Sequence, residues 1–155
     1  MALITFLRQG ISGMVRHRDG IQSYAAFGQK VDESQFGAGC YDAGSPMRWF
    51  APHAEVRFYR PDEATQFEIV AYLPRESLDQ YGPAEVTLFE DGVSLGTARL
   101  VAPEVQPMRW MLPPGPAGDK HLTLVSKPRR RGGAADDREL GIVVESLGYL
   151  PLPSP

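Results

Sequence analysis

The sequence predicts an all-β domain, an antiparallel β-sandwich of about eight strands in a jelly-roll-like arrangement, preceded by an N-terminal helical arm. Apolar and polar residues alternate with a period of two from about residue 38 onward, as is typical of strands with one buried face. The 155 residues include 16 glycines and 14 prolines, and tight turns between short strands use both. A chain of this length suits one domain with a sizeable core.

The N-terminal arm, residues 1–35, differs from the rest of the chain. Apolar residues recur there at helical spacing, which predicts a helix over about residues 2–18. They are Leu3, Leu7, Ile11, Met14 and Val15. The apolar face of this helix has more than one possible partner. It can pack on the domain or on a second copy of the chain, or it can lie on a membrane surface, because basic residues flank it at 16–18.

Eight later segments have the pattern of strands, and loops rich in glycine, proline or charge separate them. In chain order they are MRWFA (47–51), HAEVRFYR (53–60), QFEIVAYL (66–73), AEVTLFE (84–90), VSLGTARLV (93–101), QPMRWML (106–112), KHLTLVS (120–126) and ELGIVVESLGYL (139–150). No helix-length segment stands between them, which favours an antiparallel sandwich over a parallel α/β sheet. We therefore assign residues 36–150 to the sandwich and residues 151–155 to a disordered tail.

The tetrapeptide PMRW occurs twice and contains both tryptophans of the chain. Successive side chains of a strand point to opposite faces. This alternation predicts that Trp49 and Trp110 point into the core, whereas Arg48 and Arg109 point outward. Trp49 follows the loop GAGCYDAGSP, so a position at the end of the sandwich, where a ligand could stack on its ring, also remains open for it.

The order GCYDAGSPMRWFAPHAEVRFYRP, VTLFEDGVSLGTARL, HLTLVSKP and DDRELGIVVESLGYL resembles the β-sandwich accessory domain of bacterial glycosyltransferases and other surface-polysaccharide biosynthesis proteins. The shared motifs are a Gly-x-Tyr segment, an Arg-Trp pair and a D-x-R-x-L-G turn that opens the last strand. The resemblance covers about residues 36–150. It implies a bacterial, non-catalytic, carbohydrate-associated binding module that is linked to glycan biosynthesis.

These motifs also indicate a candidate carbohydrate site at the loop end of the sandwich. A sugar needs an aromatic surface for the apolar side of its ring and planar polar groups for its hydroxyls. The candidate residues are Tyr41, Arg48, Trp49, Arg138 and Glu139. For Arg138 and its neighbour Asp137, a charged turn that only closes a loop is the alternative. The expected partner is a glycan or a glycan-biosynthesis protein.

The sequence carries no signature of catalysis, so we do not expect an enzyme. It has no GxSxG elbow and no P-loop, and nothing around Cys40, the only cysteine, marks it as a nucleophile. The three histidines are far apart in the sequence, so we expect no histidine-based metal site and no cofactor. The basic run at residues 127–131 lacks interleaved aromatic residues, so we do not expect nucleic-acid binding.

A single cysteine, no recognisable leader and no apolar run of membrane-spanning length predict a cytoplasmic protein without a transmembrane segment. The net charge of −3 is too small to indicate a strongly charged partner. One alternative function belongs to another class. The protein could be a structural or assembly protein whose N-terminal arm drives homo-oligomerisation or docks a partner protein.

Overall fold

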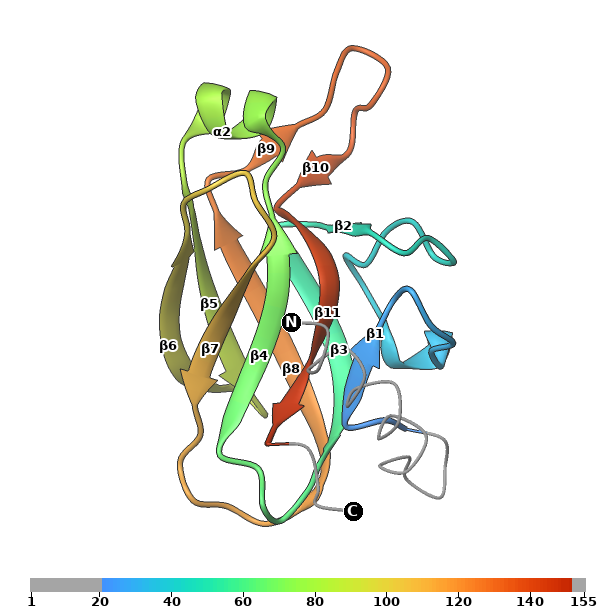
Figure 1. The fold of residues 1–155 in the computed structure, drawn as a ribbon, viewed down its shortest axis with the longest axis vertical. Helices are drawn as coiled ribbons and strands as arrows, with labels where there is room; N and C mark the ends of the chain where they lie inside the picture. The colour runs from blue at the N-terminus through green and yellow to red at the C-terminus, as the bar shows by residue number, and fades with distance from the viewer. Residues whose placement is uncertain (1–20, 152–155) are drawn as a thin grey trace.

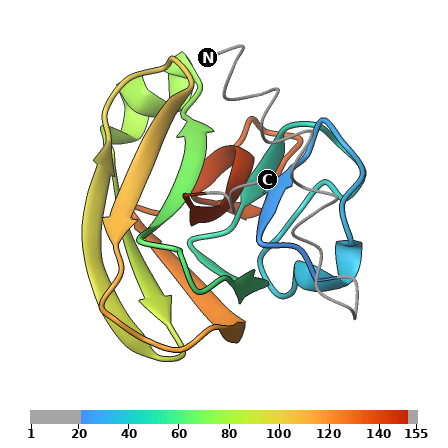
Figure 2. The ribbon, with the colours of Figure 1, turned by 60° about the horizontal axis from the view of Figure 1, so that its bottom comes forward.

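The computed structural model describes residues 21–151, which form two antiparallel sheets packed face to face (Figures 1 and 2). The first sheet has the order β1-β11-β4-β7, and a short strand β2 also pairs with β11. Its strands are β1 (Tyr24–Ala26), β2 (Arg48–Phe50), β4 (Gln66–Tyr72), β7 (Gln106–Met111) and β11 (Ile142–Leu150). The second sheet has the order β3-β8-β5-β6. Its strands are β3 (His53–Arg60), β5 (Ala84–Glu90), β6 (Val93–Leu100) and β8 (Gly118–Lys127).

The connections between the strands are those of a jelly roll. If β1, β3 to β8 and β11 are taken as the main strands, the first sheet contains the first, eighth, third and sixth of them. The second sheet contains the second, seventh, fourth and fifth. This is the two-sheet order of a jelly roll. The predicted antiparallel sandwich is therefore confirmed, and its turns follow the expected chemistry, since Asp91 and Gly92 between β5 and β6 both have positive φ.

The core lies between the two sheets and is built from the alternating apolar positions. Apolar residues from five strands are each at most 3% exposed, as the strand patterns predict. They are Val56, Phe58, Ile69, Val86, Leu88, Met108, Trp110, Leu122 and Leu124. Three rings of this core pack edge to face, with centroids 5.8 Å apart for Phe58 and Phe67 and 5.0 Å apart for Phe67 and Tyr149.

Strand β1 lies inside the segment that the sequence assigned to the arm, residues 1–35. It pairs with β11, with Tyr24 opposite Gly148. A side chain at Gly148 would overlap Tyr24, so only glycine allows the two strands to approach this closely. The sandwich therefore begins before residue 36. The predicted helix over residues 2–18 and residues 152–155 of the predicted tail lie outside the described residues.

Strand β2 presents the opposite face from the one predicted, so the expectation that Trp49 points inward and Arg48 outward is wrong. Arg48 and Phe50 are 3% and 0% exposed, and Trp49 between them is partly exposed. Phe27, which follows β1, packs edge-on against Phe50 with centroids 6.2 Å apart. Phe27 thus covers this side of β2 and fixes which residues are buried there.

Three smaller elements were not expected from the sequence. They are the 3-10 turn η1 (Glu33–Gln35), the helix α2 (Arg75–Tyr81) and the hairpin of β9 (Arg130–Arg131) with β10 (Glu139–Leu140). Figure 1 shows that α2, the β9–β10 hairpin and β2 all lie at the same end of the sandwich. Of the helices within residues 21–151, none is long and apolar enough to cross a membrane.

Candidate functional site

A polar cluster at this end joins the loop before β2 to the turn before β10. The Tyr41 hydroxyl donates a hydrogen bond to the carbonyl oxygen of Glu139, 98 residues later, at 3.1 Å. The guanidinium carbon of Arg138 lies 4.9 Å from the centre of the Tyr41 ring. Three of the five predicted site residues, Tyr41, Arg138 and Glu139, are therefore in contact.

The arginine of this cluster is held by two carboxylates. Arg138 donates to both carboxylate oxygens of Asp136, at 2.9 and 2.8 Å, and to Oδ1 of Asp42 at 2.9 Å. The hydrogen bonds from Arg138 hold the pKa of Asp136 below its usual value and raise the pKa of Arg138 itself. The two carboxylates neutralise the charge of Arg138, and their hydrogen bonds close the loop. This matches the alternative given for this turn, a charged turn that only closes a loop.

Asp42 links this cluster to the backbone of Trp49. Its backbone has a positive φ of 59°. Its Oδ2 accepts a hydrogen bond from the Trp49 backbone amide at 3.2 Å, while its Oδ1 binds Arg138. The Tyr41 amide donates to the Trp49 carbonyl at 3.0 Å. The backbone of Trp49 is therefore held on both sides.

Arg48 does not belong to this surface, which corrects its place among the candidate residues. Its Nη1 and Nη2 donate to the two carboxylate oxygens of Glu33 at 2.7 and 2.8 Å, and its Nε donates to the Ser45 carbonyl at 2.8 Å. Its guanidinium carbon lies 4.1 Å from the centre of the Phe27 ring. The hydrogen bonds from Arg48 lower the pKa of Glu33. Arg48 thus stabilises the fold and offers nothing to a ligand.

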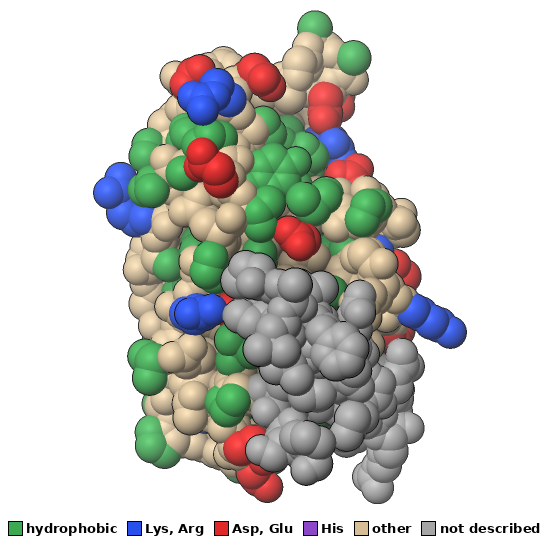
Figure 3. Space-filling view, in the orientation of Figure 1, with side chains coloured by type: hydrophobic (Ala, Val, Ile, Leu, Met, Phe, Trp, Pro, Cys, Tyr) green, Lys and Arg blue, Asp and Glu red, His purple; other side chains and the backbone are tan. Residues whose placement is uncertain are grey.

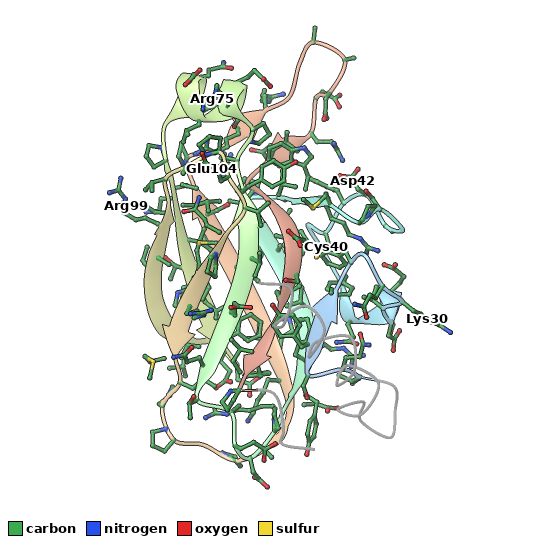
Figure 4. The ribbon with its side chains drawn as sticks, in the orientation of Figure 1. Lys30, Cys40, Asp42, Arg75, Arg99 and Glu104 are labelled. Atoms are coloured by element: carbon green, nitrogen blue, oxygen red, sulfur yellow. The ribbon has the colours of Figure 1, made fainter. Side chains whose placement is uncertain are left out.

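Trp49 lines an open hollow of about 280 Å³ that is bordered by β2, α2 and the β9–β10 hairpin. Its other lining residues are Pro74, Glu76, Ser77, Gln80, Arg131, Gly132 and Gly133. Figure 3 shows hydrophobic side chains gathered below α2 at this end of the molecule, with charged side chains around them, and Figure 4 shows Arg75 on α2 at the same end. The hollow therefore combines an aromatic ring with several polar groups.

Arg130 fixes the position of α2 relative to β9. Its side chain is fully buried. Its Nη1 donates to the carbonyl and hydroxyl oxygens of Ser77, both at 3.1 Å, and its Nη2 donates to the Gly82 carbonyl at 2.5 Å. Burial lowers the pKa of Arg130. One wall of the hollow is thereby anchored by an arginine from the basic run at residues 127–131, for which the sequence indicated no structural role.

Sequence reasoning missed the lining residues of α2, although a local signal was present. The segment RESLDQY contains mostly good helix formers and no β-branched residue, with a proline before it and a glycine after it. Those flanking residues are typical of helix ends. The wall formed by Ser77 and Gln80 could therefore have been suspected from the sequence, whereas its contact with β9 could not.

Cys40 lies close to the site but has an unreactive environment. Its Sγ contacts the Glu55 carbonyl at 3.6 Å, and burial raises the pKa of the thiol to about 12. At pH 8 we expect iodoacetamide to alkylate Cys40 at least roughly 100-fold more slowly in the folded protein than in urea, because the thiolate is the reactive form. Mass spectrometry of quenched samples measures both rates, and equal rates would contradict the buried thiol.

A second polar cluster lies on the outer face of the second sheet. Nε2 of His53 and Nε2 of His121 lie 3.2 and 3.0 Å from the two carboxylate oxygens of Glu55. These hydrogen bonds hold the pKa of Glu55 below its usual value, and the one with His121 has the larger effect. The pairing of β3 with β8 brings the two histidines together. In the part of the chain that the structure describes, no three His, Cys, Asp or Glu side chains are arranged to hold a metal ion.

No protein-family model matches the sequence, and no curated protein matches it either. Among solved structures, the chain is similar to the carbohydrate-binding module CBM36 in complex with calcium and xylotriose. The two are 15% identical with a TM-score of 0.39, and the match covers 63% of this chain and 72% of that one. It is also similar to the CBM36-1 domain of a multidomain xylanase from the hindgut metagenome of Trinervitermes trinervoides. Here the identity is 15%, the TM-score is 0.40, and the match covers 66% and 73% of the two chains.

A third similar structure is the Agl-KA catalytic domain, 15% identical with a TM-score of 0.49. That match covers 85% of this chain but 28% of the other, so this chain corresponds to a small part of it. At these identities and TM-scores the likeness does not extend to the ligand of any of these proteins.

Proposed function

We propose that this protein is a non-catalytic carbohydrate-binding module and that its site is the hollow lined by Trp49. The observation that carries this proposal is a partly exposed tryptophan in a hollow of about 280 Å³ with polar side chains around it. The indole ring offers a flat apolar surface for the C–H side of a sugar ring. Ser77, Gln80 and Arg131 offer hydrogen-bonding groups for its hydroxyls.

The rigidity of the two walls supports this proposal. The backbone of Trp49 is held by Asp42 and Tyr41, and α2 is held by Arg130. A ligand that enters a preformed hollow orders few protein groups, so less of the interaction energy is lost on binding. The predicted site residues Tyr41, Arg138 and Glu139 then support Trp49 and do not themselves contact the sugar.

The test is the substitution Trp49→Ala. Sugar binding in the millimolar to micromolar range corresponds to about 4–8 kcal/mol, and stacking on one aromatic ring is a large share of so small a total. We therefore expect glycan-array screening to identify a ligand and calorimetry to show at least a tenfold loss of affinity in this variant, or about 1.4 kcal/mol.

The matched control is Phe89→Ala, because Phe89 is a partly exposed ring on the outer face of the second sheet, away from the hollow. This variant should bind as the unaltered protein does. Circular dichroism should show that both variants are folded. Binding that survives Trp49→Ala in a folded protein would place the site elsewhere, and binding of no glycan at all would refute the proposed function.

The finer assignments follow from the sequence resemblance. The link to bacterial glycan biosynthesis, a protein partner from that process and a cytoplasmic location stay predictions. The assembly alternative depends on residues 1–18, which lie outside the described part of the chain. Comparing the mass in solution of the full chain with that of a chain lacking residues 1–18 tests it, since an interface in that segment would make the shorter chain less associated.

A further inference from the structure

We infer that the ligand of this hollow is an anionic saccharide, a sugar that carries a carboxylate, sulfate or phosphate group. This inference rests on the proposed glycan-binding function and names the substrate class of that same site. It is carried by the hydrogen-bond donors that line the hollow and by the arginine charges around it.

Arg131 is the main donor on the wall of the hollow. Its side chain is exposed, and its Nη1 donates to the Asp137 carbonyl at 3.3 Å. A guanidinium has five N–H donors, and within residues 21–151 the others have neither a hydrogen-bond acceptor nor a carboxylate in contact. Its planar fork matches two oxygens of a carboxylate, sulfate or phosphate. Arg131 is therefore suited to bind an anionic group of a sugar that stacks on Trp49.

Ser77 supplies a second hydrogen-bond donor to the hollow because the buried Arg130 already donates to its hydroxyl oxygen. Its Oγ is 3.1 Å from Nη1 of Arg130. Arginine can only donate, so Ser77 must accept this hydrogen bond, and its own hydroxyl proton is left to donate elsewhere. Because Ser77 also lines the hollow, its hydroxyl is available to an acceptor-rich ligand there.

The charges at this end of the molecule also favour an anion. Among the arginines of the β9–β10 hairpin, Arg129 pairs with Glu139 at 3.0 Å and Arg138 pairs with two aspartates. The buried Arg130 contacts carbonyl and hydroxyl oxygens but no carboxylate of the described residues. Its charge lies behind the wall of the hollow, where water screens it poorly. Glu76 is the one carboxylate among the lining residues, so the two arginines outweigh it.

The experiment compares neutral sugars with counterparts that carry an anionic group at C6. They are oligosaccharides of glucose and of glucuronate, oligosaccharides of galactose and of galacturonate, and glucose with its 6-sulfate and 6-phosphate. Binding to the isotopically labelled full chain is followed by NMR titration, which measures millimolar affinities. We expect the charged member of a pair to bind about tenfold tighter than the neutral one, since charge-assisted hydrogen bonds are about twice as strong as neutral ones. Added salt should remove most of this preference.

Three substitutions test which charged residues cause the preference for the anionic sugar. Arg131→Gln should reduce the affinity for the charged sugar about tenfold more than it reduces the affinity for the neutral sugar, because the amide keeps hydrogen-bonding groups but lacks the charge. Glu76→Gln should raise the affinity for the charged sugar a few-fold, because it removes a like charge. Arg99→Gln is the matched control, because Arg99 is exposed on β6 and does not line the hollow. It should change neither affinity.

The outcomes distinguish this inference from the proposed function. If a neutral sugar binds as tightly as its charged counterpart, or if Arg131→Gln leaves the preference unchanged, the anionic ligand is refuted while binding lost in Trp49→Ala still supports a glycan site. If inorganic sulfate or phosphate alone binds as tightly as the matching sugar ester, the hollow is an anion site without a sugar, which overturns the inference. If no sugar binds, the proposed function fails as well.

Discussion

Replacing Trp110 with alanine is expected to lower the free energy of unfolding by about 3–5 kcal/mol, the usual range for a buried tryptophan. The Trp110 side chain is 3% exposed, and its Nε1 donates to the Gly96 carbonyl at 3.0 Å. The ring therefore joins β7 of one sheet to β6 of the other. The substitution opens a cavity in the core and removes the partner of that carbonyl. Urea denaturation measures this loss of stability when it is monitored by backbone circular dichroism, a signal that does not depend on the tryptophan itself.

The other copy of PMRW provides the matched control. Trp49 is partly exposed, so Trp49→Ala should cost about 1 kcal/mol or less. A loss of stability as large as that for Trp110→Ala would mean that Trp49 is part of the core, and its availability to a ligand would then be in doubt. A loss below about 1 kcal/mol for Trp110→Ala would contradict the burial of that ring.

The second large effect concerns a buried ion pair at the far edge of the core. Arg60 and Glu90 are joined at 2.9 Å, and their side chains are 5% and 10% exposed. The Tyr149 hydroxyl donates to Glu90 at 2.7 Å, and Arg60 also donates to the Pro113 carbonyl at 2.6 Å. Arg60→Met leaves the Glu90 carboxylate buried without its cation. We expect it to lower the free energy of unfolding by about 3–5 kcal/mol.

Two further variants test this cause. Arg57→Met replaces an exposed arginine of the same strand and should change the stability by about 0.5 kcal/mol or less. Adding Glu90→Gln to Arg60→Met should recover part of the loss, because a neutral amide needs no cation. Equal denaturation midpoints for Arg60→Met and Arg57→Met, or no recovery in the double variant, would show that the buried charge is not what destabilises the protein.

The strand pattern predicted much of the fold because the burial of a side chain in a strand with one face toward the core follows its position along the strand. In β3, Val56 and Phe58 are buried while Arg57 between them is exposed, as their alternation predicts. The second PMRW copy behaves in the same way, with Trp110 buried and the Arg109 side chain 46% exposed. Each of these strands is long, lies within a sheet and has one face toward the other sheet.

The candidate site was predicted only in part, and β2 shows why. This strand has three residues, and its burial is set by Phe27 and Glu33 from the segment before it, which cover Arg48. Nothing local to PMRW records that cover, so the alternation was assigned to the wrong face. The motifs at Tyr41 and Arg138 were correctly brought to one end of the sandwich, but their role is to hold the loop that positions Trp49.

The sequence by itself determined the architecture of this protein, because the two-residue period and the turn residues are local properties of the chain that predict strands and the loops between them. Only the tertiary structure decided which tryptophan is partly exposed and which arginines, among residues 21–151, have no carboxylate partner. The two PMRW segments have the same sequence but different surroundings. In β7 the inner face of the sheet buries Trp110. In β2 the cover from Phe27 and η1 lies on Arg48, so Trp49 on the opposite face is partly exposed. The same holds for Arg129, Arg130 and Arg131. Of three adjacent arginines, Arg129 forms an ion pair with Glu139 of β10, Arg130 is buried against Ser77 of α2, and the Arg131 side chain is exposed and donates only to the Asp137 carbonyl among the residues that the structure describes.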